Sequence, residues 1–153
     1  MNFSITRILT LPLAILLGLA YTGCTQSEAS IPEVMVYKSP TCGCCSKWVE
    51  HMQEAGFVVN TTDVEDVSVY KKQYGLPAGM GSCHTAIVDG YVVEGHVPAD
   101  VVKRMLKEKP AIAGIAVPGM PMGSPGMEQG GQVDSYDIVS FDVEGNTAVY
   151  ASR

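Results

Sequence analysis

Short apolar segments alternate with segments of helical periodicity along most of the chain. Residues 34–37 form an apolar run that ends at Ser39-Pro40, which predicts a buried strand followed by a break. The next segment stops at Gly56 and has apolar residues at helical spacing, namely Cys45, Trp48, Val49, Met52 and Ala55. The motif SPTCGCCSKW, residues 39–48, is therefore expected to place its three cysteines at the N-terminus of a helix.

The rest of the pattern predicts two more helices and two hairpins. The expected elements are a strand over 57–62, a helix over 63–77 with Val67, Tyr70 and Tyr74 facing inward, a hairpin over 84–95, a helix over 98–110 and a terminal hairpin over 135–151. The first hairpin turns at Asp89-Gly90, a pair that favours tight two-residue turns. Residues 111–132 are rich in proline, glycine and methionine without any period, which indicates a loop.

This order of elements matches the thioredoxin-like plan. A strand, a cysteine-bearing helix, a strand, a helix, a hairpin and a helix follow one another along the chain. The sequence therefore predicts an α/β protein, a thioredoxin-like mixed sheet flanked by helices, with a C-terminal β-hairpin. A chain of 153 residues suits a single domain, which we expect over residues 33–153.

The first residues have the composition of an export signal. Arg7 precedes an apolar run, residues 8–20, which is shorter than the roughly 20 apolar residues of a membrane span. We expect a signal peptide over residues 1–23 and a tether over residues 24–32. Cys24 ends a segment that resembles a bacterial lipobox, so we expect it to carry a lipid; ordinary signal-peptidase cleavage nearby is the alternative. These features predict the periplasm of a Gram-negative bacterium, with the lipid alone attaching the protein to the outer membrane.

The net charge narrows the class of partner. The chain has a formal charge of −6 and no cluster of lysine and arginine, which phosphate binding requires. The sequence therefore excludes a nucleic-acid partner and favours a small ligand.

The cysteines at 42 and 45 have the spacing of redox enzymes, in which a helix N-terminus stabilises a reactive thiolate. Cys44 disturbs a simple two-electron cycle, because a third thiol can attack a mixed disulfide. In thioredoxin-like proteins a cis-proline opens the strand beside these cysteines. Aligning GMGSCHTAIVDG, residues 79–90, puts His84 in the place of that proline and Cys83 just before it. Both side chains are therefore expected to face the loop from Cys42 to Cys45.

Four thiols and an imidazole in one shallow site favour a soft metal ion. A structural zinc site usually takes cysteines at least two residues apart, whereas Cys44 and Cys45 are adjacent. Adjacent thiolates more easily bridge separate ions, which favours Cu(I), in more than one copy, over zinc. Two structural disulfides are an alternative in an exported domain. A bridge from Cys42 to Cys45, however, closes too small a loop to add much stability.

Methionines and histidines provide further candidate ligands. Met120 and Met122 predict a capture site, because a thioether binds Cu(I) even at low pH; Met127 lies in the same segment, and Met80 is a weaker candidate. Packing against the core is the alternative role for these methionines.

The sequence gives weaker support for metal binding by the two histidines outside the cysteine motifs, His51 and His96. His51 lies roughly 10 Å from Cys44 along the predicted helix, so we expect it to pack or to form a hydrogen bond. His96 is expected as a satisfied surface histidine, and it reaches a metal only if its turn folds back.

Three motifs carry a family resemblance. They are SPTCGCCSKWVEHMQEAGF, GMGSCHTAIVDGYVVEGHVPADVVKRML and IAVPGMPMGSPGME. With them the chain resembles the CopG-type periplasmic copper-resistance family over roughly residues 34–128. The resemblance implies a thioredoxin-like fold, export, and copper handling through matching cysteines. It also strengthens the case for His51, His84 and His96, which lie within the matched motifs.

The resulting hypothesis is an exported copper-binding protein of copper resistance that sequesters Cu(I) through a cysteine cluster and cycles its redox state. A thiol-disulfide oxidoreductase is the alternative, and the sequence leaves enzymatic activity open. Besides copper ions, other exported copper-handling proteins are the expected partners. The expected metal ligands are Cys42, Cys44, Cys45, Cys83, His84, His96, Met120 and Met122.

Overall fold

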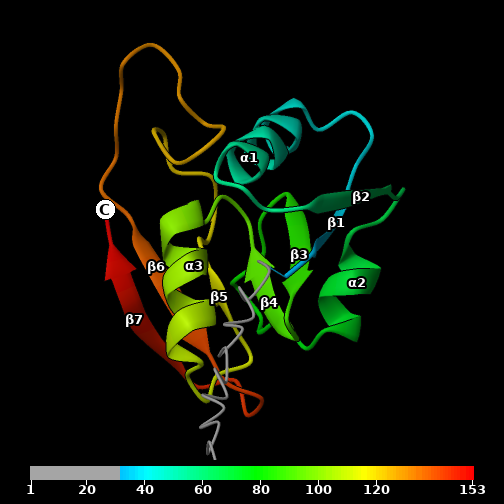
Figure 1. Ribbon diagram of the computed structural model, residues 1–153, viewed down its shortest axis with the longest axis vertical. Coiled ribbons are helices and arrows are strands. Elements are labelled where there is room, and N and C mark those ends of the chain that lie inside the picture. Colours follow the sequence, from blue (N-terminus) through cyan, green and yellow to red (C-terminus); the bar gives the residue numbers. More distant parts are fainter. Residues whose placement is uncertain (1–31) are drawn as a thin grey trace, which may run out of the picture.

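The protein is described here by a computed structural model that covers residues 32–153 (Figure 1). The predicted signal peptide, Cys24 and nearly all of the predicted tether lie outside the described residues. The described chain forms one seven-stranded mixed sheet in the order β2-β1-β3-β4-β5-β6-β7. Among the described residues, no helix has the length and apolar character needed to span a membrane.

The first four strands of the sheet form the thioredoxin-like half. Strand β1 (Val34–Lys38) pairs in parallel with β2 (Val59–Asp63), and helix α1 (Gly43–Glu54) connects the two. On its other side β1 pairs antiparallel with β3 (His84–Val88), which forms the predicted hairpin with β4 (Tyr91–Glu94). The prediction of a thioredoxin-like mixed sheet is confirmed.

The remaining three strands extend this sheet. Strand β5 (Gly114–Ala116) pairs in parallel with β4 and antiparallel with β6 (Asp137–Phe141), and β6 pairs with β7 (Thr147–Ser152) as the predicted terminal hairpin. The prediction of an unbroken loop over residues 111–132 is wrong at β5. A strand of three residues is too short to show a period. Its first residue must be glycine, because a Cβ there would meet the Val92 carbonyl and the Phe141 ring.

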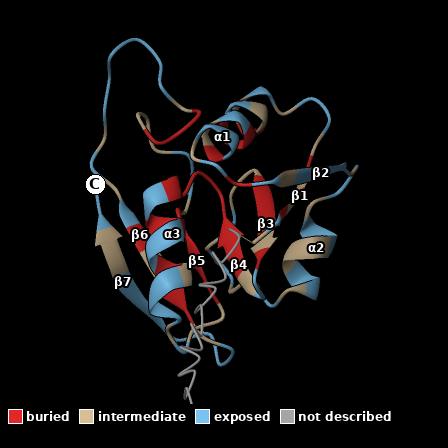
Figure 2. Ribbon diagram, viewed as in Figure 1, coloured by how far each residue is buried: buried red, intermediate tan, exposed pale blue. Residues whose placement is uncertain are grey.

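Two helices cover one face of the sheet. Helices α1 and α3 (Ala99–Glu108) lie over the strands in Figure 1, and their buried sides meet the sheet in Figure 2. They share one core with the inward-facing residues of the strands, which includes Val34, Val36, Trp48, Met52, Val93, Val102, Met105 and Ile115. The apolar positions read from helical spacing in α1 are buried, apart from Ala55, which is half-buried.

The second helix is shorter than predicted. Helix α2 spans only Ser68–Gln73 and has no fully buried residue, whereas the sequence predicted a helix over residues 63–77. Tyr70 stacks on Tyr37 with ring centroids 4.0 Å apart, and the hydroxyl of Tyr74 lies 3.2 Å from that of Tyr37. The predicted inner face therefore packs on Tyr37 of β1, an inner strand of the sheet, and outside the main core.

The opposite face of the sheet has a smaller apolar cluster. It contains Val92, Ala116 and Phe141, and the chain after α2 packs on it through Tyr74, Leu76 and Met80. Because successive strand residues point to opposite faces, Val92 lies in this cluster and Val93 in the main core.

Candidate metal centre

The cysteine motif occupies the start of α1, as its spacing predicted. Cys42 is the residue that precedes the helix, and Cys44 and Cys45 lie in its first turn. Cys42 and Cys45 form a disulfide with a Cα–Cα distance of 5.3 Å, while Cys44 and Cys83 are free thiols. The alternative of two structural disulfides is therefore not the state observed here.

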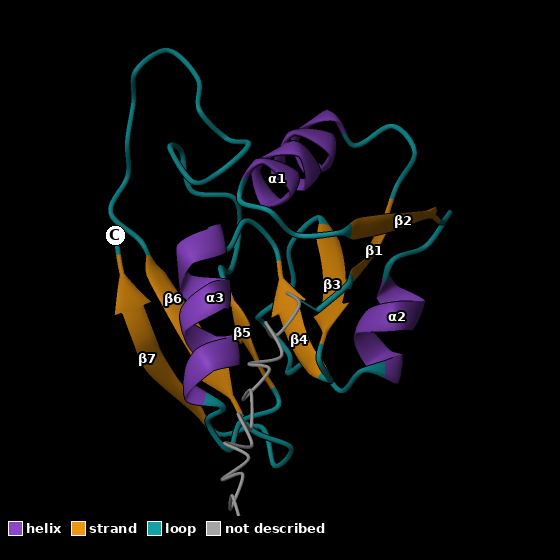
Figure 3. Cartoon of the chain, in the orientation of Figure 1, coloured by secondary structure: helices purple, strands orange, loops and turns teal. Residues whose placement is uncertain are grey.

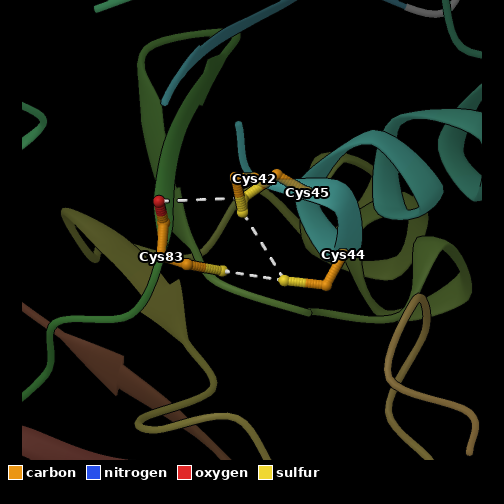
Figure 4. Close-up of side chains that lie close together, drawn as sticks. All are labelled: Cys42, Cys44, Cys45 and Cys83. Carbon is orange, nitrogen blue, oxygen red and sulfur yellow. Dashed lines mark hydrogen bonds between the residues drawn. A yellow bond between two sulfur atoms is a disulfide. The ribbon is translucent and has the colours of Figure 1, made fainter. Parts of the chain in front are cut away.

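Strand β3 brings the fourth sulfur to this helix. The antiparallel pairing of β1 with β3 sets His84 opposite Lys38, so Cys83 lies where the chain of β1 turns toward α1. The Sγ of Cys83 lies 3.9 Å from the Sγ of Cys44, which in turn lies 3.5 Å from the Sγ of Cys42 (Figure 4). The disulfide-bonded Sγ of Cys45 lies 3.8 Å from the Cys83 carbonyl oxygen in the same view. All four sulfur atoms lie within 4.8 Å of one another.

Two histidines border Cys83 on its other side. The Nε2 of His96 lies 3.0 Å from its Sγ, and the Nδ1 of His84 lies 3.6 Å from it. The turn after β4 folds back over the site, and His96 is fully buried. The expectation of a surface histidine at position 96 is therefore wrong. Cys83, His84 and His96 form a second group of metal-binding side chains that shares its thiol with the first.

A loop contact sets the tautomer of His96. Its Nδ1 lies 2.8 Å from the Pro125 carbonyl oxygen, which only accepts hydrogen bonds, so Nδ1 carries the proton. The bare Nε2 then faces Cys83. This loop runs beside α1 before it returns to β6 (Figure 3). At Gly126, where φ is +87°, a Cβ would lie 2.7 Å from the Cys44 carbonyl oxygen.

The environment keeps His84 neutral. Its ring is fully buried against Trp48, with ring centroids 4.4 Å apart, and its Nε2 has no hydrogen-bond partner. Burial holds the pKa of His84 well below its ordinary value, and the nearby His96 and Lys71 act in the same direction. Burial also lowers the pKa of His96.

Cys83 is a protonated thiol at neutral pH in this state. Burial, with the nearby Cys44, raises its pKa to about 11. A metal ion bound at Cys83 must therefore displace a proton.

A buried ion pair beside Cys83 was not found from the sequence. The carboxylate of Glu94 is fully buried and pairs with Lys71 from α2. It also accepts hydrogen bonds from the Ser82 amide at 2.6 Å and from the Thr85 hydroxyl at 2.7 Å. The signal was a charge at the fourth position of the apolar strand YVVE, on the same face as Val92.

The remaining candidates lie at different depths. Met120 is 52% exposed, and Met122 and Met127 are half-buried, all in the loop that holds His96 through Pro125. Met80 packs on the smaller apolar cluster. His51 accepts a hydrogen bond from the amide of Ala99 at 3.1 Å, which confirms the expectation that it forms a hydrogen bond.

The fold and the site together define a thioredoxin-like protein with a thiol and imidazole cluster suited to a soft metal ion. Two solved structures, described as "Copper resistance protein copG", forms 1 and 2, each match with 42% identity and a TM-score of 0.76. Each match covers 80% of this chain and 98% of the other. A family model described as "Protein of unknown function, DUF411" matches residues 80–127. No curated protein gives a significant match.

The chain therefore belongs to the CopG copper resistance family, as the sequence motifs predicted.

Proposed function

We propose that this protein sequesters Cu(I) at the sulfur cluster of Cys42, Cys44, Cys45 and Cys83 and binds more than one ion per chain. The observation that carries the proposal is the convergence of four sulfur atoms within 4.8 Å, from two segments that are far apart in the sequence. His84 and His96 add imidazole ligands at the Cys83 end of the cluster. The copper resistance proteins to which this chain is similar support copper as the metal.

The arrangement of the sulfurs favours copper over zinc. Cys44 and Cys45 are adjacent in one helical turn, so their side chains leave the helix in different directions. One zinc ion needs four ligands around a single tetrahedron. Adjacent thiolates can instead bridge neighbouring Cu(I) ions, and soft thiolate ligands select Cu(I).

The oxidation state of the cysteines limits the metal capacity. In the disulfide state, Cys44 and Cys83 are the thiols that remain among residues 32–153. Reduction of the disulfide by an external dithiol, which is itself oxidised to a disulfide, returns Cys42 and Cys45 to the set of sulfur ligands. We propose that the reduced form is the one that takes up copper.

The proposal extends to how copper arrives and where the protein acts. The exposed Met120 and the nearby Met122 would capture Cu(I) and pass it inward. Imidazole ligands also suit Cu(II), so the one-electron oxidation of bound Cu(I) to Cu(II) by an external electron acceptor belongs to the same proposal. We place the protein in the periplasm, with residues 1–23 as signal peptide, 24–32 as tether, Cys24 as lipid anchor and 33–153 as the binding domain. Other exported copper-handling proteins would be its partners.

A Cu(I) titration tests the proposal. Reduced protein is titrated without oxygen in the presence of a Cu(I) chelator, and bound copper is counted after desalting. We expect more than one Cu(I) per chain, and a clear loss of bound copper in Cys83→Ser. A stoichiometry of one that Cys83→Ser leaves unchanged would contradict the proposal.

One observation favours a second candidate, a thiol-disulfide oxidoreductase. The Cys42–Cys45 disulfide lies at the N-terminus of α1, where a helix stabilises a thiolate. Against it, His84 stands where such enzymes have a cis-proline, and none of the described peptide bonds is cis. Metal-free reduction of insulin that survives Cys44→Ser and is lost in Cys42→Ser would favour this candidate.

A further inference from the structure

The ion pair of Glu94 and Lys71 is attached to both ends of the segment that carries Cys83. One carboxylate oxygen of Glu94 accepts from the amide of Ser82, the residue before Cys83. The other accepts from the hydroxyl of Thr85, two residues after Cys83. The ammonium of Lys71 completes the arrangement by donating to the same Thr85 hydroxyl at 3.1 Å.

A close backbone approach holds the same segment from a third side. Gly95 follows Glu94 with a φ of +71°, and a Cβ there would lie 2.6 Å from the Cβ of Ser82. The amide of Gly95 donates to the His84 carbonyl at 3.1 Å. The end of β4 therefore fixes the backbone on both sides of Cys83.

The energetics of such a pair suggest a role other than stability. Removing two charges from water is costly, and replacing a buried pair with apolar residues is often neutral or stabilising. Glu94 is fully buried, and the side chain of Lys71 is 18% exposed. The hydrogen bonds of the carboxylate orient the main chain on either side of Cys83. A metal ligand must be held in one orientation by the groups around it, and Cys83 is such a candidate ligand.

We propose that Glu94, with Lys71 as its counter-ion, is a positioning residue that sets the Cys83 sulfur beside Cys44 for copper binding. This inference rests on the proposed function for its copper part. It also predicts a metal-free property, the proximity of the Cys44 and Cys83 thiols, 3.9 Å apart. The two parts can therefore fail separately.

The metal-free arm uses a Cys24→Ser, Cys42→Ala, Cys45→Ala chain, in which Cys44 and Cys83 are the remaining cysteines. Diamide, which is reduced as two thiols form a disulfide, is added, and the rate of Cys44–Cys83 bond formation is followed by peptide mass spectrometry. Glu94→Met with Lys71→Met removes the tethers without leaving an unpaired buried charge. We expect this pair of substitutions to slow the reaction about tenfold. Glu94→Gln, which can still bridge Ser82 and Thr85, should restore most of the rate.

The copper arm is a double-mutant cycle in the otherwise wild-type chain. The Met pair should weaken Cu(I) binding about tenfold when Cys83 is present and have no further effect in Cys83→Ser. A merely structural role would weaken binding equally in both backgrounds and would overturn the inference. An unchanged diamide rate would overturn it as well. If wild-type protein fails to bind copper while the diamide rates behave as expected, the proposed function fails and the positioning role stands.

A fallback variant covers the case in which the Met pair does not fold. Thr85→Val removes one tether and leaves the ion pair intact, and thermal unfolding reports its stability. The same cycle with Cys83→Ser then decides between positioning and structure.

Discussion

The Nε2 of His96 lies 3.0 Å from the Sγ of Cys83, across 13 residues of sequence. The Pro125 carbonyl holds the other ring nitrogen, so a loop that follows β5 orients an imidazole toward the sulfur cluster. Through His96, the loop that follows β5 therefore contacts the cysteine site of the thioredoxin-like half.

Replacing His96 should lower the affinity for Cu(I) by more than a loss of folding stability would explain. His96→Phe removes the nitrogen that faces Cys83, and we expect Cu(I) affinity to fall about 10- to 100-fold. Competition with a chromophoric Cu(I) chelator measures the affinity. The matched control is His51→Phe, which removes the bond to the Ala99 amide and should cost about 1 kcal/mol of unfolding free energy. Equal affinities for the two variants would show that His96 is not a ligand.

The number of reactive thiols should depend on the redox state. In a Cys24→Ser chain, denatured without reductant, we expect two thiols to react with Ellman's reagent, because Cys42 and Cys45 are bonded. Prior reduction should raise the count to four, and only the reduced sample should take up its full complement of Cu(I). Equal copper loading before and after reduction would refute the role proposed for Cys42 and Cys45.

Stability of the metal-free protein should fall in weak acid. The pKa of His84 lies well below its ordinary value of 6.5 and that of His96 is also lowered, in both cases mainly through burial. Below about pH 6.5 the unfolded chain therefore binds protons that the folded protein does not, and unfolding becomes easier as the pH drops. For His84 the slope approaches about 1.4 kcal/mol per pH unit.

Urea denaturation between pH 7.5 and 5 measures this dependence. His84→Gln should flatten the curve, because it removes the buried imidazole whose pKa is lowered. A wild-type curve that is level across this range would contradict the buried, neutral state of His84.

Two glycines of the methionine loop should respond differently to alanine. Both Gly119 and Gly126 have positive φ, so alanine at either adds strain of about 1–2 kcal/mol. Gly119 faces open space, whereas a Cβ at Gly126 would strike the Cys44 carbonyl and the Trp48 amide. We expect Gly126→Ala to cost a further amount on the order of 1–3 kcal/mol and to weaken copper binding. Thermal unfolding and copper titration of both variants check this, and equal behaviour would mean that the loop does not press on α1.

The methionines should control uptake rather than capacity. Met120→Leu with Met122→Leu keeps the apolar volume and removes both thioethers, so we expect slower Cu(I) uptake at an unchanged final stoichiometry. Trp48 is the single tryptophan and lies against His84, so its fluorescence can report metal arrival in stopped flow. Met52→Leu, in the core, is the control. A normal uptake rate in the double variant would assign these methionines to packing.

Much of the site could be predicted because its parts have local signals. The helical period from Cys45 to Met52 placed the cysteines at a helix start, and the strand pattern after His84 placed Cys83 beside them. Glu94 and His96 could not be placed in the same way. Glu94 needs Lys71 from another element to be understood, and the position of His96 depends on a turn without periodicity.

Periodicity along the chain was enough to determine the thioredoxin-like half, its cysteine-bearing helix and the terminal hairpin, since apolar residues must reach one core from each element. Tertiary structure alone decided the short strand β5, the pairing of Cys42 with Cys45, the burial of His96 and the ion pair beside Cys83. These features depend on contacts between segments that are far apart in the sequence. A local sequence pattern does not predict the energies of such contacts. The loop after β5 shows this most clearly, because its proline and glycine residues predict no element, yet its path over α1 completes the site.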